Sequence, residues 1–231
     1  MSTILASSLV SRSGTLIQDK TKIRWPEAEL LDWLNDGQRE VVLLKPEACV
    51  TNGPVLLQAG KTKQTLPATG IILLDLVRNM GAAGSTPGQA ITICSREVLD
   101  QVIPEWHSVA NDLGYIQHYT FDPRDPKTYY TYPKAPATSW YVDLVFSSAP
   151  ANATEGSVIS IDDIYSNALL DYMLYRCYSK DATFAQNATL AAAHYQLFLN
   201  SLGGKGAVES ATNPNKLGNS AGNPNIPVRA A

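Results

Sequence analysis

Residues 24–46 read RWPEAELLDWLNDGQREVVLLKP, and this stretch decides the class of fold. Pro26 suits the first turn of a helix, and Glu27 and Glu29 suit the positive end of a helix dipole. Proline cannot continue a helix, so the helix ends at Lys45-Pro46. The stretch therefore predicts an amphipathic helix. Its apolar side is formed by residues at helical spacing: Leu30, Leu31, Leu34, Val41 and Val42.

Helical spacing returns in the last third of the chain. One apolar stripe covers residues 161–173 over three turns, and a second covers 184–202. We expect Asp181 to cap the start of the second helix and Gly203-Gly204 to end it. A short connection predicts an antiparallel pair. A shorter helix is expected over residues 3–18. Small side chains in the second helix allow a neighbouring helix to approach closely: Ala188, Ala191, Ala192 and Ala193.

The middle third of the sequence has strand-like character. Asn52-Gly53-Pro54 predicts a turn that leads into a β-hairpin ending at Leu66. Loops and proline-rich turns separate the segments that follow. Strands are expected over residues 71–78, 91–93, 115–121, 128–132 and 140–146, with a helical turn over 96–103. These short segments predict a small sandwich or a barrel-like sheet.

The last segment, residues 203–231, differs in composition from the rest. It is rich in glycine, contains two Asn-Pro-Asn units and has few large apolar residues, so it cannot bury enough apolar surface to order itself alone. Three cations and one acid give it a formal charge of +2, which leaves −5 on the rest of a chain whose total is −3. We expect an extended or disordered arm.

Together these patterns predict an α+β protein. Residues 1–50 supply the N-terminal helices of a bundle, and residues 159–202 supply a C-terminal helix pair that completes it. Residues 51–158 form an antiparallel β-rich insertion between them. Residues 203–231 form the arm.

Composition narrows the classes of function. Hydrophobic residues make up 45% of the chain, but charged residues only 17%, below the roughly 25% of ordinary domains. A surface poor in charge is typical of one that partners cover. The negative net charge argues against a basic nucleic-acid binder. Three distant cysteines predict reduced, buried thiols, and neither a signal peptide nor a membrane span is apparent.

Each candidate catalytic or metal-binding residue in the sequence is better explained by a structural role. Residues 81–88 contain glycines but no phosphate-binding motif, which favours a flexible loop. His107, His118 and His194 lie in different elements without the spacing of metal ligands. Asp122 and Asp125 belong to Asp-Pro turns, Asp162-Asp163 suits the start of a helix, and no nucleophile motif occurs. We predict no enzyme, no cofactor and no metal site.

Three stretches together resemble a known family. They are residues 24–46, residues 119–133 (YTFDPRDPKTYYTYP) leading into Val142–Pro150, and residues 162–181 (DDIYSNALLDYMLYRCYSKD). Their order is similar to that of the head-to-tail adaptors of tailed bacteriophages, which are related to the tail tubular adaptor of short-tailed phages. The resemblance covers most of residues 20–202.

The resemblance implies a structural virion protein at the head–tail junction, made in the host cytoplasm. Such adaptors are helical bundles with an inserted β region, and they form a dodecameric ring under the portal protein. The ring meets a tail nozzle or tail tube protein below and continues the DNA channel. DNA passes through the lumen without specific binding, no membrane is involved, and no catalytic residues are carried over.

By the same resemblance, the arm docks along the portal or a neighbouring subunit. We expect Leu217, Ile226 and Val228 to be its apolar anchors and the Asn-Pro-Asn units, including Asn223 and Pro224, to keep it extended. The simpler alternative is a terminal tail without a role.

Two other functions remain open at this point. One is another neck or tail-terminator protein of a phage. The other is a carbohydrate-binding or hydrolase module, in which Tyr129, Tyr132 and Trp140 would line a groove. A monomeric DNA-binding protein is disfavoured by the charge.

Overall fold

The computed structural model describes residues 2–184 and 186–212. Its helices and its mixed β-sheets confirm the predicted α+β class. The chain divides into two compact units. Within the described residues, the helical unit contains 2–37, 153–159 and 163–212, and the β unit contains 38–152 and 160–162.

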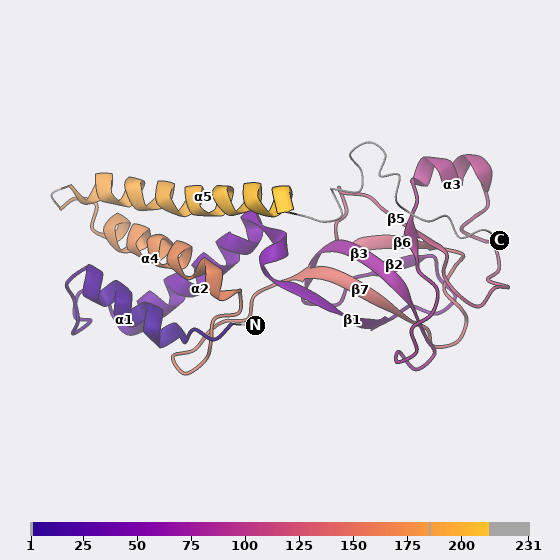
Figure 1. The fold of residues 1–231 in the computed structure, drawn as a ribbon, viewed down its shortest axis with the longest axis horizontal. Coiled ribbons are helices and arrows are strands. Elements are labelled where there is room, and N and C mark those ends of the chain that lie inside the picture. The colour runs from indigo at the N-terminus through magenta and orange to yellow at the C-terminus, as the bar shows by residue number, and fades with distance from the viewer. Residues whose placement is uncertain (1, 185, 213–231) are drawn as a thin grey trace. The chain divides into compact units, whose positions relative to one another are not determined.

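The helical unit is built from four α-helices and one 3-10 turn, coloured from indigo to yellow in Figure 1. Helix α4 contacts both α1 and α5, and α5 runs antiparallel to it, as the sequence predicted. The elements are α1 (Ala6–Leu16), α2 (Glu27–Leu44, of which the part up to Gly37 belongs here), the 3-10 turn η2 (Asp163–Tyr165), α4 (Ser166–Lys180) and α5 (Asn187–Thr212).

Most residues of the predicted apolar stripes form the core of this unit, but Ile164, Phe184 and Ala188, which the stripes included, are exposed. Burial of such side chains is the main favourable contribution to folding. The ring of Phe198 on α5 lies against Tyr172 on α4, with centroids 5.3 Å apart. At Gly37 on α2, an added Cβ would lie 3.0 Å from Cδ1 of Tyr172, so glycine permits the close approach of α2 to α4. The fully buried residues include Leu9, Val10, Leu30, Leu34, Leu169, Met173 and Phe198.

Both ends predicted for α5 are wrong. Asp181 follows the last residue of α4, and α5 begins only at Asn187, whose side-chain amide donates to the Asp181 carboxylate (3.1 Å). At the other end the helix continues through Gly203-Gly204 to Thr212. Glycine ends a helix when it adopts the left-handed conformation, and in a helix interior it costs only about 1 kcal/mol relative to alanine.

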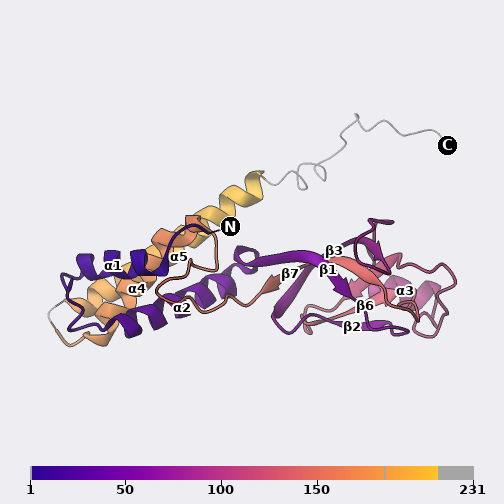
Figure 2. The same ribbon diagram turned by 90° about the horizontal axis from the view of Figure 1, so that it is seen from below.

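The β unit contains two sheets among the described residues. One has the order β1-β7-β3 and the other β2-β6-β5-β4. Figure 2 shows β1, β3 and β7 in one layer and β2 and β6 in the other. The elements are η1 (Pro46–Ala48), β1 (Val50–Leu56), β2 (Lys63–Thr65), β3 (Gly70–Gly81), β4 (Thr92–Ile93), α3 (Arg96–Val102), β5 (His118–Phe121), β6 (Thr128–Tyr132) and β7 (Tyr141–Ser148).

The two sheets share one hydrophobic core. This is the arrangement of a small sandwich rather than of a closed barrel. The predicted antiparallel pairing holds except between β4 and β5, which are parallel. Strand β7 contributes alternate inward residues, as a half-buried strand should. The core includes Leu73, Leu76, Ile91, Ile116, Tyr119, Tyr129, Val142, Leu144 and Phe146.

The predicted turn at Asn52-Gly53-Pro54 is wrong, because these residues lie inside β1, which pairs with β7 rather than with β2. The Cys49 carbonyl accepts from Ser148 N (2.8 Å), and Leu57 N donates to the Trp140 carbonyl (2.9 Å). Odd-numbered residues of β1 therefore point their backbone groups toward β7, and Pro54 points away. Proline is tolerated there because a free sheet edge requires no N–H from it.

A buried asparagine joins several segments of the β unit. Asn79 on β3 is 2% exposed, and all its side-chain hydrogen-bonding groups have partners. Its Nδ2 donates to the carbonyls of Gln89 (3.0 Å) and Ile116 (2.8 Å). Its Oδ1 accepts from Ile116 N (2.9 Å) and from Trp140 Nε1 (2.9 Å). Asn79 lies in a largely apolar run of the sequence, where no local pattern marks it as a junction.

Candidate functional site

The three histidines have separate structural partners. Nδ1 of His107 lies 3.3 Å from Thr62 Oγ1, and Nδ1 of His118 lies 2.7 Å from Thr92 Oγ1. Nδ1 of His194 lies 3.0 Å from the Asp171 carboxylate. Over residues 2–184 and 186–212, no group of three His, Cys, Asp or Glu side chains is arranged to hold a metal ion.

The cysteines are free thiols in different surroundings. Cys177 is buried, as predicted, and burial raises the pKa of its thiol to about 12. A thiol of this kind is inert at neutral pH, because the thiolate is the nucleophile. Cys49 and Cys94 are only partly buried, so the prediction of buried thiols is wrong for these two.

The acidic residues act as structural acceptors. The Asp122 carboxylate accepts from Arg124 N (2.9 Å), and this bond lowers the pKa of Asp122, as the predicted turn requires. Asp163 lies in the first turn of η2, at the helix start where the sequence predicted it, and it also accepts from the backbone N–H groups of Thr3 and Ile4, so it holds the N-terminal segment. Hydrogen bonds from the Thr3 and Ser2 hydroxyls and from Thr3 N hold the pKa of Asp163 well below its usual range.

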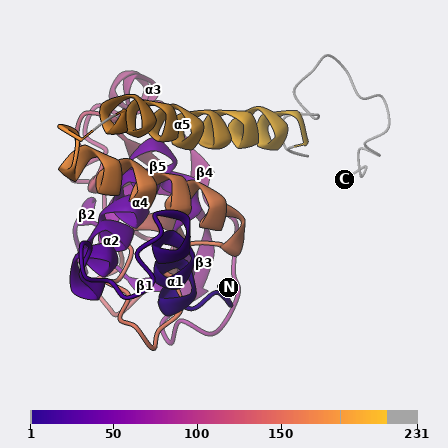
Figure 3. The same ribbon diagram turned by 90° about the vertical axis from the view of Figure 1, so that its left-hand side faces the viewer.

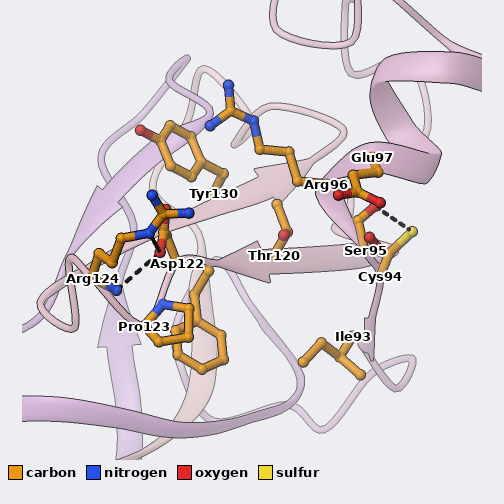
Figure 4. A pocket seen from close by; sticks show the side chains of 11 residues that line it. Ile93, Cys94, Ser95, Arg96, Glu97, Thr120, Asp122, Pro123, Arg124 and Tyr130 are labelled. Carbon is orange, nitrogen blue, oxygen red and sulfur yellow. Dashed lines mark hydrogen bonds and ion pairs between the residues drawn. The ribbon is translucent and has the colours of Figure 1, made fainter.

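A pocket of about 550 Å³ opens on the β unit between α3 and the ends of β4, β5 and β6. Figure 4 shows Arg124 turned toward Asp122 and the Cys94 thiol toward the backbone of Ser95. Arg96, which also lines the pocket, pairs with Asp100 on the same helix (3.5 Å). Both arginines thus have carboxylate partners, and no histidine lines the pocket as a base for the thiol. This geometry does not favour catalysis.

The aromatic groove of the carbohydrate-binding alternative does not form. Neighbouring residues of a strand face opposite sides of a sheet, so Tyr129, in the core, and Tyr132, three residues later on β6, do not share a face. Tyr129 is 1% exposed, and burial raises its pKa. Trp140 packs on the core and donates to Asn79. Tyr129 and Trp140 thus belong to the core of the β unit, and Tyr132 does not.

Two open grooves are better candidates for contacts with other proteins. An apolar groove of about 530 Å³ lies in the β unit between the end of α2 and the start of β3, with Leu43 and Ile71 on its walls. Leu43 is 73% exposed. Apolar surface left open in this way is typical of interaction sites. Leu43 lies off the main apolar stripe of its helix, so helical periodicity does not reveal it.

A second groove, of about 430 Å³, lies in the helical unit between α1 and α4. We call it the α1–α4 groove. Arg12 on its wall donates to Asn167 Oδ1 (3.4 Å). Its lining is Ser8, Ser11, Arg12, Thr15, Leu16 and Leu170.

The predicted anchors of the arm lie outside the described residues, and their docking stays a prediction: Leu217, Asn223, Pro224, Ile226 and Val228. The described helices include none that is long and apolar enough to cross a membrane.

No curated protein matches the chain. The family model of the SU10 adaptor protein matches residues 4–218, which include both units and the whole of α5. The adaptor resemblance seen in the sequence is thereby confirmed. The chain belongs to the SU10 adaptor protein family, a family of phage head-to-tail adaptors that are structural proteins and not a known class of enzyme.

Proposed function

We propose that the protein forms a ring between the portal and the tail of a bacteriophage and that this ring continues the DNA channel. The observation that carries the proposal is the family match over residues 4–218. The ring is expected to be dodecameric, with a tail nozzle or tail tube protein below it. Its place is the head–tail junction of the virion.

Two physical features support a ring around DNA. The grooves beside Leu43 and between α1 and α4 offer uncovered surface for neighbouring proteins. Residues 1–202 carry a formal charge of −5, and a surface of that sign does not grip phosphate by counterion release. A lumen through which DNA slides requires this property.

The mass of the protein alone and after mixing with the portal tests the proposal. A ring-sized complex with a fixed number of copies per portal is expected. A strict monomer that ignores the portal would overturn it.

We also propose that the segment beyond α5 fastens the adaptor to the portal. Because α5 continues to Thr212, deletion of residues 213–231 leaves the helix intact. A deletion that started at the predicted helix end, Gly203-Gly204, would remove part of α5. The deletion should weaken portal attachment without unfolding the body. A second variant replaces Leu217, Ile226 and Val228 by serine and keeps the length. Portal affinity equal to that of the full chain in both variants contradicts this role.

A further inference from the structure

The outer side of α5 lacks the charges of an ordinary exposed helix. Residues 187–204 read NATLAAAHYQLFLNSLGG and contain no Asp, Glu, Lys or Arg. Ala191, Phe198 and Leu202 on one side are buried in the helical unit. A helix on the surface of a globular protein usually carries charged residues on its other side. Over residues 187–204 the exposed side of α5 has none, and it carries apolar residues such as Leu190 and Leu197 beside the uncharged polar Gln196 and Asn200.

The uncovered side has a defined ridge. Leu190 is 41% exposed and Leu197 is 52% exposed, and Ala193 between them is exposed as well. Their spacing of i, i+3 and i+7 places them on one face. We call these three residues the α5 ridge. Figure 3 shows α4 on one side of α5 and the end of α5 running past the other helices.

The α1–α4 groove has the features that such a ridge requires. Ser8, Ser11 and Thr15 follow one another along α1 with the same spacing of i, i+3 and i+7, and all three are exposed. Small side chains let the axes of two packed helices come close, and ridges of one helix fit into grooves of another. Leu16, 53% exposed, and Leu170 add apolar surface to the groove.

We propose that the α5 ridge of one copy packs into the α1–α4 groove of the next copy in the ring. Both surfaces lie on the helical unit, so every copy carries both halves of the contact. An unrelated partner could cover either the α5 ridge or the α1–α4 groove, but it would not explain why the same chain carries both. Contacts between two different surfaces are heterologous, and they generate closed rings when the rotation between copies closes. The inference deepens the proposed function and rests on it.

Charged substitutions test the ridge. In L190D/L197D two carboxylates enter a contact whose groove lining holds one cation, Arg12, so at least one carboxylate has no cationic partner there, and we expect the ring population formed with the portal to fall about tenfold or more. The matched control is L56D/L113D, which makes the same two changes at leucines of the β unit that line neither groove and are 51% and 50% exposed. Circular dichroism checks that each variant is folded. A ring population equal to wild type in folded L190D/L197D overturns the proposal.

Cysteine cross-linking identifies the occupant of the groove. With Cys49 and Cys94 replaced by serine, copies carrying T15C are mixed with copies carrying L197C, and the portal is added. We expect disulfide-linked pairs that contain one copy of each variant. Disulfides in L197C alone would show that α5 packs on α5 of a second copy. A disulfide between L197C and an engineered cysteine set on the portal would show that the portal covers the ridge. Either result overturns the assignment.

The two hypotheses fail in different ways. If the wild-type protein stays monomeric with the portal, the ring itself is wrong. If wild-type rings form and T15C does not link to L197C, only the contact assigned here is wrong.

Discussion

Single polar residues fix the connections between segments that are distant in the chain. Asn79 joins β3 to the segments at Gln89, Ile116 and Trp140 through four hydrogen bonds. Asp163 joins the N-terminal segment to the start of α4. Because a buried polar group without a partner is costly, the buried Asn79 is more sensitive to substitution than its polarity suggests.

The substitution Asn79→Ala should lower the free energy of unfolding by about 2 kcal/mol or more, because it leaves the carbonyl and the N–H of Ile116 and the indole N–H of Trp140 without their partner. Urea unfolding measures the change. The control Asn52→Ala removes an exposed asparagine of β1 and should change the stability little. A loss for Asn79→Ala no larger than that of the control would contradict the network.

The contribution of Asp163 to stability should depend on pH. Its pKa is lowered in the folded protein, so its stabilisation is present above the unfolded value of 3.8 and is lost as the pH falls below that value. The difference in urea midpoint between wild type and Asp163→Asn should therefore be constant near neutral pH and shrink below about pH 4. The exposed Asp112→Asn is the control. A difference that does not depend on pH excludes an ionised Asp163 as the anchor.

At the scale of elements, periodicity predicts which side of a helix is buried but not where the helix ends. The stripes of α2 and α4 agree with the structure, with Leu34, Leu169 and Met173 fully buried. The predicted end of α5 at Gly203-Gly204 and the predicted turn at Asn52-Gly53-Pro54 disagree with the structure. Whether a glycine or a proline interrupts a helix or a strand depends on its tertiary surroundings. Proline at a free edge loses no hydrogen bond, and glycine inside a packed helix is tolerated.

The substitution Gly37→Val tests the close approach of α2 and α4. The new side chain meets Tyr172 and Leu169, and overpacking should lower the free energy of unfolding by about 1–3 kcal/mol even though valine favours the helix more than glycine does. Thermal or urea unfolding measures the loss. The control is Gly204→Ala, where an added Cβ has no neighbour within 4 Å. The control should be neutral or stabilising, and destabilisation there would argue against a continuous α5.

For the whole molecule, the distribution of charge matters more than its sum. Residues 213–231 contain Lys216 and Arg229 and no acid, whereas residues 1–202 carry −5. Proteins retain DNA when their Lys and Arg side chains bind phosphates and thereby release the counterions of the DNA. A proposed channel formed by a negatively charged body lacks this source of affinity and lets DNA pass. The same distribution leaves the basic segment for a protein partner.

The full chain should therefore show no measurable affinity for a labelled DNA duplex at about 0.15 M salt, in fluorescence anisotropy. The variant without residues 213–231 lacks Lys216 and Arg229 and keeps the negatively charged body. It should bind DNA no better than the full chain at any salt concentration. Tight, salt-dependent binding by the truncated body would contradict the proposed role of its charge.

The sequence by itself determined the α+β class, the helical and β regions, the sides of the helices that are buried and the adaptor family. These properties are set by local periodicity and by residue order. Only the tertiary structure decided that β1 pairs with β7, that Asn79 is a buried junction, and that Tyr129 and Tyr132 do not share a groove. It also decided that the apolar residues of α5 divide between a buried side and an open ridge. The physical reason is that pairing and burial depend on segments far apart in the chain, whereas propensity and spacing report only on near neighbours.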